Sequence, residues 1–267
     1  MLEYHVTAHN IDPQADNAIH DDVVAAQFGF SGALVPGVEL FAYATSPLVA
    51  AWGDTWLSHG RIDLRFRLPV YDQEQLVVTL TDGLLAVTGP DGQVRCTGSA
   101  APRQDQPAVR PQPEAPMPEV LAPAPSRGPL GSLHDRFTAE QNLAYLDAIG
   151  EPLQVYRDKS LAHPGLILRL VNRLLMTNIA LGPWVHTSSS CQLLGAAQLP
   201  AELTVRGTIT EVYERNGQDY VRYDALVLAD EMPVMAVDHR AIYRLNGPRQ
   251  LDKKSAVAQS PDRTART

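Results

Sequence analysis

A proline-rich stretch, residues 103–129, sets the strongest limit on how this 267-residue chain can fold. Eight prolines lie in it. Because each proline fixes φ and lacks an N–H, the stretch cannot form the interior of a helix or of a central strand. We expect an extended connector between an N-terminal block, residues 1–102, and a C-terminal block, residues 130–246. The polar tail, residues 247–267, is expected to be disordered.

The N-terminal block begins with helical patterns and continues with alternating ones. Residues 20–29 predict a short helix, and residues 32–53 carry apolar side chains at helical spacing. Pro47 should kink this second helix because it removes a backbone donor. Apolar and polar residues then alternate between turn residues, which predicts an antiparallel meander with strands at 61–71, 75–83, 84–89 and 94–100.

The C-terminal block repeats this order. Residues 137–150 predict an amphipathic helix. Residues 163–182 are apolar on almost every side, which is typical of a buried helix, and a curved sheet wrapped around it is the simplest way to bury it. Strands are expected at 200–213, 218–230 and 233–245. The shared order of elements indicates an internal duplication.

Charge and cysteine content narrow the classes of function. The formal net charge is −8, which argues against a nucleic-acid partner. Only Cys96 and Cys191 occur, without the spacing of a zinc site, so we expect buried thiols and no metal. No signal peptide is visible, and Pro183 with the serines after it interrupts the uncharged stretch 174–201. We therefore expect a cytoplasmic protein without a membrane span.

The segment D-N-A-I-H-D-D at 16–22 is followed by F-G-F-S-G-A-L-V-P-G-V at 28–38. It resembles the signature of the MaoC-like dehydratases and R-specific enoyl-CoA hydratases, G-D-x-N-P-x-H, which precedes a short helix and a glycine-rich segment leading into a central helix. In that family a curved antiparallel sheet wraps one long helix, and many members carry two such hotdogs in one chain. The resemblance covers most of residues 4–101 and, more weakly, 137–245. It implies an α+β double hotdog.

The resemblance also assigns residues. Asn17 falls on the Asn of the signature and His20 on its catalytic His, but Ala15 occupies the position of the catalytic Asp. In the C-terminal block Glu151 falls on the Asp position, and Tyr156 replaces the His. Neither half therefore holds the complete acid/base pair.

Addition of water to an enoyl thioester needs a base for the water, an acid at Cα and stabilisation of an oxyanion. We expect His20 to be the acid/base, since histidine titrates near neutral pH, and Asn17 to orient it. The alternatives are a solvated residue at a helix start and an ordinary turn residue. Asp16 is the nearest carboxylate but stands one residue out of register. Asp21 and Asp22 are expected to stabilise the start of the following helix.

Further candidates for substrate binding lie at the starts of the two long helices and in an aromatic segment after the second. Helix starts offer backbone N–H groups and favour negative charge. For the aromatic segment, a partly buried strand edge is the alternative interpretation. The candidates are Val35, Gly37, Val38, His163, Gly165, Trp184 and His186.

The resemblance implies a carbon–oxygen lyase, a hydratase or dehydratase acting on an α,β-unsaturated acyl thioester or related carbonyl compound, without a cofactor. Ala15 at the Asp position leaves two alternatives open. One is a repurposed hotdog enzyme (an isomerase, cyclase or thioesterase-like protein) acting on a small metabolite. The other is a non-catalytic hotdog subunit. A homodimer, or pairing with another hotdog chain, would cover exposed sheet edges.

Overall fold

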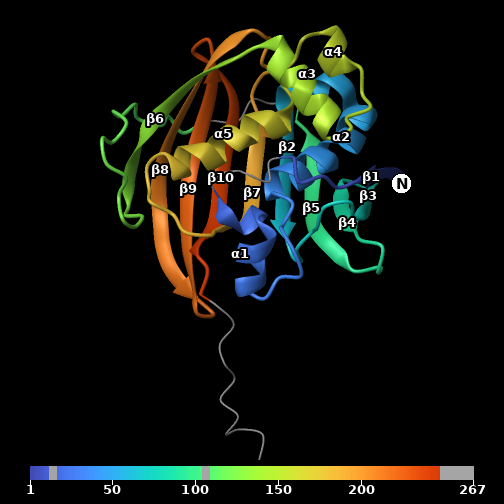
Figure 1. Cartoon of the computed structure of the whole chain (residues 1–267). Helices are drawn as coiled ribbons and strands as arrows, with labels where there is room; N and C mark the ends of the chain where they lie inside the picture. Colours follow the sequence, from blue (N-terminus) through green and yellow to red (C-terminus); the bar gives the residue numbers. More distant parts are fainter. Residues whose placement is uncertain (12–16, 104–108, 247–267) are drawn as a thin grey trace, which may run out of the picture.

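A computed structural model describes residues 1–11, 17–103 and 109–246. Its strands form one antiparallel sheet of ten strands in the order β1-β3-β4-β5-β2-β7-β10-β9-β8-β6 (Figure 1). The N-terminal block supplies β1 (Leu2–Thr7), β2 (Gly60–Phe66), β3 (Gln75–Thr81), β4 (Leu84–Thr88) and β5 (Val94–Pro102). The C-terminal block supplies β6 (Gly128–Phe137), β7 (Val185–Leu193), β8 (Ala201–Arg215), β9 (Gln218–Ala229) and β10 (Met232–Arg244).

The two halves meet at β2 and β7 in the middle of this sheet. The strands pair antiparallel, with a register that runs from Arg61 opposite Gln192 to Arg65 opposite Ser188. Backbone hydrogen bonds therefore join the halves, and any site at this junction can take side chains from both.

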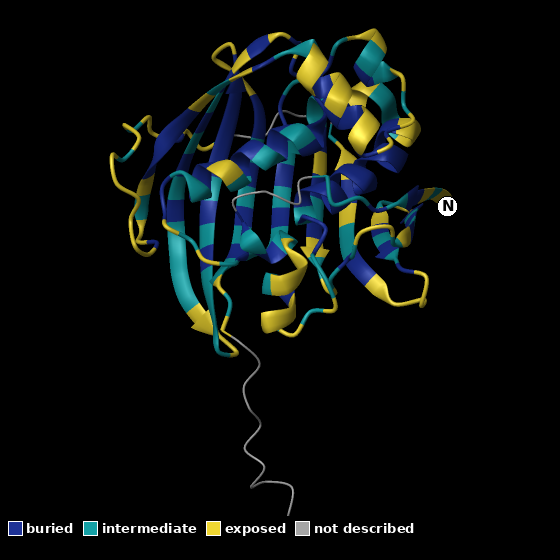
Figure 2. Ribbon diagram, viewed as in Figure 1, coloured by how far each residue is buried: buried dark blue, intermediate teal, exposed yellow. Residues whose placement is uncertain are grey.

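Helices cover one face of the sheet (Figure 1). The long helix α2 (Gly37–His59) packs against β1, β2, β3, β5 and β7, and α5 (Pro164–Met176) packs against β6, β8, β9 and α2. The shorter helical elements are η1 (Ala18–His20), α1 (Asp22–Gln27), α3 (Ala139–Ala148) and α4 (Val155–Asp158). Figure 2 shows buried residues along the sheet strands and many of the exposed ones in the short helices and loops. One continuous core fills the space between the sheet and the two long helices.

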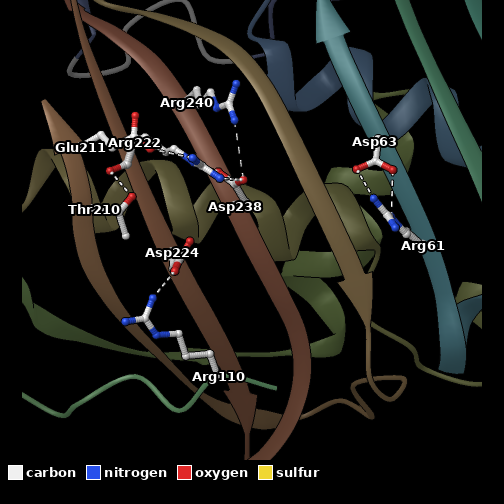
Figure 3. Close-up of polar contacts among 9 residues, drawn as sticks. All are labelled: Arg61, Asp63, Arg110, Thr210, Glu211, Arg222, Asp224, Asp238 and Arg240. Atoms are coloured by element: carbon white, nitrogen blue, oxygen red, sulfur yellow. Dashed lines mark hydrogen bonds and ion pairs between the residues drawn. The ribbon is translucent and has the colours of Figure 1, made fainter. Parts of the chain in front are cut away.

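The other face of the sheet carries charges. Arg61 and Asp63 alternate with the buried Ile62 and Leu64, so the charged side chains point away from the helices. Their neighbours on this face form further ion pairs, which join Arg222 to Asp238 and Glu211, Arg240 to Asp238, and Arg110 to Asp224 (Figure 3). Ion pairs this exposed contribute little to stability. The charges lie on this face because charged and apolar residues alternate along the strands.

The predicted helices and strands occur in the predicted order, but β1, β6 and β7 were not predicted, and further details differ. The helix expected at 32–53 runs to His59, and the non-helical backbone inside it lies at Gly53 (φ 53°, ψ −140°). Glycine adopts this conformation without the cost that a side chain would add. The helix expected to reach residue 182 ends at Met176. There the side chain of Asn178 turns back to bond both backbone groups of Gly131.

Some predictions fall outside what can be compared. Asp16 and the tail 247–267 lie outside the described residues. Residues 109–127 contain no helix and no strand longer than an isolated bridge, but the division into two blocks and a connector stays a prediction. None of the described helices combines the length and the hydrophobicity needed to cross a bilayer.

Candidate active site

A cavity of about 620 Å³ opens where the two halves meet. This volume lies within the range of pockets that bind small molecules. The N-terminal half contributes Asn17, His20, Leu34, Val35, Gly37 and Phe66, among others. The C-terminal half contributes Asn172, Trp184, His186, Tyr213, Tyr220 and Arg240, among others. The cavity is therefore a product of the β2–β7 junction.

Asn17 ties the His20 segment to the other half of the chain. Its Oδ1 accepts hydrogen bonds from the N–H of Ile19 at 3.4 Å and of Trp184 at 3.2 Å. Its Nδ2 donates to the carbonyl of Trp184 at 2.9 Å. Both backbone groups of Trp184 are thus satisfied by one buried amide, which fixes the three-residue turn η1 against the strand that follows Trp184.

The hydrogen bonds of His20 define its tautomer. Its Nδ1 lies 2.6 Å from the carbonyl oxygen of Leu34, and a carbonyl oxygen can only accept, so Nδ1 carries the hydrogen. In the neutral ring Nε2 then has a lone pair, towards which the Asn17 amide points from 3.3 Å. A histidine held in this way presents a base on the side of the ring away from Leu34.

The start of α2 faces the same cavity. Pro36 precedes the helix and provides no side-chain cap, and the first N–H groups of a helix have no acceptor within it. Gly37 lines the cavity, so its N–H and the positive end of the helix dipole suit an anionic oxygen. The expectation for Val35 needs correction, because its N–H is already bonded to the carbonyl of Val70 at 2.8 Å, although the residue lines the cavity. Val38 is not among the lining residues, and a role for its backbone N–H stays a prediction.

Three buried polar atoms on lining residues have no hydrogen-bond partner among the described residues. They are Nδ1 of His186, Nε1 of Trp184 and Oδ1 of Asn172. Buried polar groups are nearly always paired, and because these three belong to lining residues, a ligand or water in the cavity can supply their partners. Trp184 is itself 3% exposed, more deeply buried than the strand-edge position considered from the sequence.

Basic and aromatic residues also line this cavity. The arginines are Arg65, Arg67, Arg215 and Arg240, and the rings of Tyr213 and Tyr220 stack at 5.2 Å. Arg240 also pairs with Asp238 on the outer face of the sheet, and the other three arginines give the lining a positive charge that favours an anionic ligand. The sequence analysis missed these residues, because they lie on several strands and at a hairpin tip and form no motif.

His163 and Gly165 do not line this cavity. His163 is fully buried, its Nδ1 accepts the N–H of Gly165 at 3.0 Å, and its Nε2 lies 3.4 Å from Glu151. Ser46 donates to the same carboxylate at 2.6 Å, and the ring of Tyr156 packs 4.6 Å from that of His163. Burial alone would raise the pKa of Glu151, but its bonds with His163 and Ser46 outweigh this and lower it. We call these residues the sealed cluster.

The other carboxylates near the signature have structural partners. Asp21 accepts from the N–H groups of Val23 and Val24 at the start of α1, as expected. Asp22 accepts from the N–H of Ala33 at 2.7 Å and so fixes the loop that leads to α2. Glu151 belongs to the sealed cluster and does not reach across to the cavity.

No protein-family model and no curated protein sequence matches the chain. Solved structures do match. A Chloroflexus aurantiacus MaoC domain protein assigned as a dehydratase shares 11% identity, covers 92% of this chain and 94% of its own, and gives a TM-score of 0.63. Rv0216 from Mycobacterium tuberculosis, described as having a double hotdog fold, shares 15% identity over 90% and 95%, with a TM-score of 0.57. The fold is a double hotdog.

A third match broadens the chemistry of these neighbours. A protein from Lactobacillus plantarum, assigned as an oleoyl thioesterase, shares 10% identity over 90% of this chain and 95% of its own, with a TM-score of 0.50. The predicted α+β double hotdog and its resemblance to the MaoC-like dehydratases are thus confirmed at the level of the fold. The reaction has to be argued from the residues of the cavity.

Proposed function

We propose that this double hotdog is a hydratase or dehydratase that adds water to, or removes it from, an α,β-unsaturated acyl thioester or a related carbonyl compound. The observation that carries the proposal is the setting of His20. Its Nδ1 is bonded to Leu34, so the lone pair of the neutral ring is on Nε2, 3.3 Å from the Asn17 amide, and the cavity that His20 lines also contains the uncapped start of α2 at Gly37.

In the hydration direction, Nε2 of His20 takes a proton from water as the water oxygen bonds to Cβ of the substrate. The π electrons of the double bond move towards the thioester carbonyl, whose oxygen becomes an enolate-like anion near the N–H of Gly37. The protonated His20 then returns its proton to Cα. One histidine serves as base and as acid, which suits a chain with Ala15 at the position of the family's catalytic Asp.

The arginines at the cavity support a substrate with an anionic carrier. Arg65, Arg67 and Arg215 line the same cavity as the base, so phosphates of a coenzyme A or phosphopantetheine arm would place the acyl group near His20. The stacked Tyr213 and Tyr220 add a flat apolar surface beside them.

The test uses the full chain and trans-2-enoyl-CoA thioesters of increasing length, with the matching 3-hydroxyacyl-CoA compounds for the reverse direction. We expect loss of the conjugated enoyl absorbance and a product heavier by one water in mass spectrometry. A chain that leaves every thioester of the series and its N-acetylcysteamine analogue unchanged would contradict the proposal.

A second candidate is thioester hydrolysis. It is favoured by Ala15 at the Asp position and by the fold shared with the thioesterase neighbour. The same assay separates the two reactions, because hydrolysis releases a free thiol that reacts with a disulfide reagent, whereas hydration does not. The cytoplasmic location and the pairing with a second hotdog chain stay predictions.

A further inference from the structure

Two buried histidines next to the cavity have no part in the reaction as described so far. The rings of His186 on β7 and His239 on β10 stack with centroids 4.0 Å apart. The hydroxyl of Ser189 bridges them, 2.7 Å from Nε2 of His186 and 2.9 Å from Nδ1 of His239. All three side chains are buried, with exposed fractions of 5%, 3% and 0% for His186, Ser189 and His239.

A break in strand register brings His186 to this position. Ser188 pairs with Arg240 but His186 pairs with Ala241, so Thr187 is an extra residue in β7. His186 and Ser189 are three residues apart and would face opposite sides of a regular strand. The bulge turns both towards the helices, and bulges that re-aim a side chain are frequent next to active sites.

Both rings are neutral at neutral pH. Burial, and to a smaller extent the nearby His239, holds the pKa of His186 well below its ordinary value. Burial lowers the pKa of His239 to about 3. Each ring therefore has one N–H and one lone pair. The Ser189 hydroxyl has a single hydrogen, so it donates to one ring and accepts from the other, and the two outer nitrogens have opposite character.

The outer nitrogen of His186 faces the start of α2. A Cβ added at Gly37 would lie 2.9 Å from Nδ1 of His186, so the ring packs directly on this glycine. Nδ1 is buried without a hydrogen-bond partner among the described residues, and His186 lines the cavity. An unsatisfied ring nitrogen and the uncapped helix start thus converge on one point.

We propose that His186 is a second catalytic residue, whose neutral ring donates its Nδ1–H to the substrate carbonyl oxygen at the start of α2. This inference rests on the proposed function. As the oxygen of water bonds to Cβ and His20 takes the proton, the electron pair that reaches the carbonyl oxygen is stabilised by His186 and the helix start together. Ser189 and His239 are positioning residues. His239 donates to Ser189, and Ser189 donates to Nε2 of His186, which leaves the hydrogen on Nδ1.

The kinetic test replaces His186. His186→Ala should lower kcat for enoyl-thioester hydration by about 10²- to 10³-fold with little change in KM, because the lost bond forms mainly in the transition state. His186→Asn, whose amide can place an N–H near the position of Nδ1, should recover part of that loss. Ser189→Ala should lower kcat by about tenfold through loss of the tautomer control. Ser190→Ala, the same change on the opposite face of β7, is the matched control and should match the parent.

A measurement independent of turnover examines the tautomer. Long-range ¹H–¹⁵N NMR of the full chain should show a protonated Nδ1 and a bare Nε2 in His186, and Ser189→Ala should mix the two forms. A bare Nδ1, or an unchanged kcat in folded His186→Ala and His186→Asn, would overturn the inference while hydration by the parent chain stands. If the parent chain hydrates none of the thioesters tested, the proposed function fails first, and the role for His186 that rests on it falls as well.

Discussion

The two long helices begin with the same Pro-Gly pair but differ in the residue before it. Val35 precedes α2, whereas His163 precedes α5 and caps that helix with its own side chain. The start of α5 is therefore satisfied within the protein, and the start of α2 is left to face a cavity. The residue before the Pro-Gly pair thus distinguishes a helix start that is capped by a side chain from one that is open to the cavity.

The polar residues near the two helix starts also differ in their surroundings. In the sealed cluster Ser46 donates to Glu151 at 2.6 Å and Nε2 of His163 lies 3.4 Å from the same carboxylate, and all three residues are almost completely buried. Nε2 of His163 and the hydroxyl of Tyr156 have no hydrogen-bond partner among the described residues. At the cavity, Nδ1 of His186 and Oδ1 of Asn172 have no partner among the described residues. Buried polar atoms without a partner therefore occur at both helix starts, but only those of His186 and Asn172 belong to residues that line the cavity, where a ligand can bond them.

The largest expected effect comes from the N-terminal half, in which the start of α2 is open to the cavity. His20→Ala should lower hydration kcat by about 10³-fold, since the variant loses its only proposed acid/base. Unfolding by urea should change little, because His20 is only partly buried. The exposed His134, replaced in the same way, is the control. Turnover at the parent rate in His20→Ala would remove the distinction between the halves.

The matched change in the sealed half should act on stability instead. His163→Ala leaves the carboxylate of Glu151 buried without its histidine neighbour, which we expect to lower the free energy of unfolding by about 3–5 kcal/mol. Turnover per folded molecule should stay near the parent value. Adding Glu151→Gln should restore part of the stability by removing the buried charge. Lost turnover at unchanged stability would place the chemistry in the sealed cluster.

The two glycines provide a smaller and more selective comparison. Gly165→Ala would place its Cβ 2.5 Å from the Tyr145 hydroxyl and 2.7 Å from Cβ of Ala42, so we expect a loss of about 1–3 kcal/mol in stability. Gly37→Ala would push on His186 and should lower kcat by about tenfold with a smaller change in stability. Equal loss of stability in both variants, with kcat unchanged, would count against a functional start of α2.

The last comparison concerns acid, and at neutral pH it has no effect. Since the folded pKa values of His186 and His239 lie below the usual value for histidine, the unfolded chain binds protons that the folded chain does not. The contribution of His239 is complete above about pH 6.5 and declines as the pH falls towards 3, by at most about 1.4 kcal/mol per pH unit, and His186 acts in the same direction. His239→Asn should flatten this profile in urea titrations, and His134→Asn should not. If the free energy of unfolding depends on pH in the same way in the parent and in His239→Asn, the neutral state of the folded His239 ring would be contradicted.

Local pattern predicted much of the fold. The clean alternation at 75–83 and 218–230 became β3 and β9, and the apolar run at 163–182 contained α5. The sequence analysis missed β1, β6 and β7, and for the last two there are physical reasons. In β7 the inward-facing side chains include His186 and Ser189, so polarity does not alternate with direction. β6 contains Pro129, which a strand tolerates at a sheet edge, where β6 lies.

The sequence predicted only those site residues that lie close together along the chain. Asn17 and His20 belong to one short motif, and the structure brings them together in the expected turn. The bond between Ser189 and His239 joins residues on different strands and depends on the bulge at Thr187, which no local pattern indicates. The arginines converge for the same reason, since strand register and not sequence distance sets their spacing.

The backbone pairing of β2 with β7 has a consequence for how such a protein can change over generations. In a homodimer of single hotdogs every substitution appears twice, so both pockets must drift together. Here the two halves belong to one polypeptide and can mutate independently. One half can therefore take on a purely structural role while the other retains the proposed catalytic residues. The two halves also depend on each other, because residues of both line the cavity. A gene that encoded one half alone would supply only part of this lining.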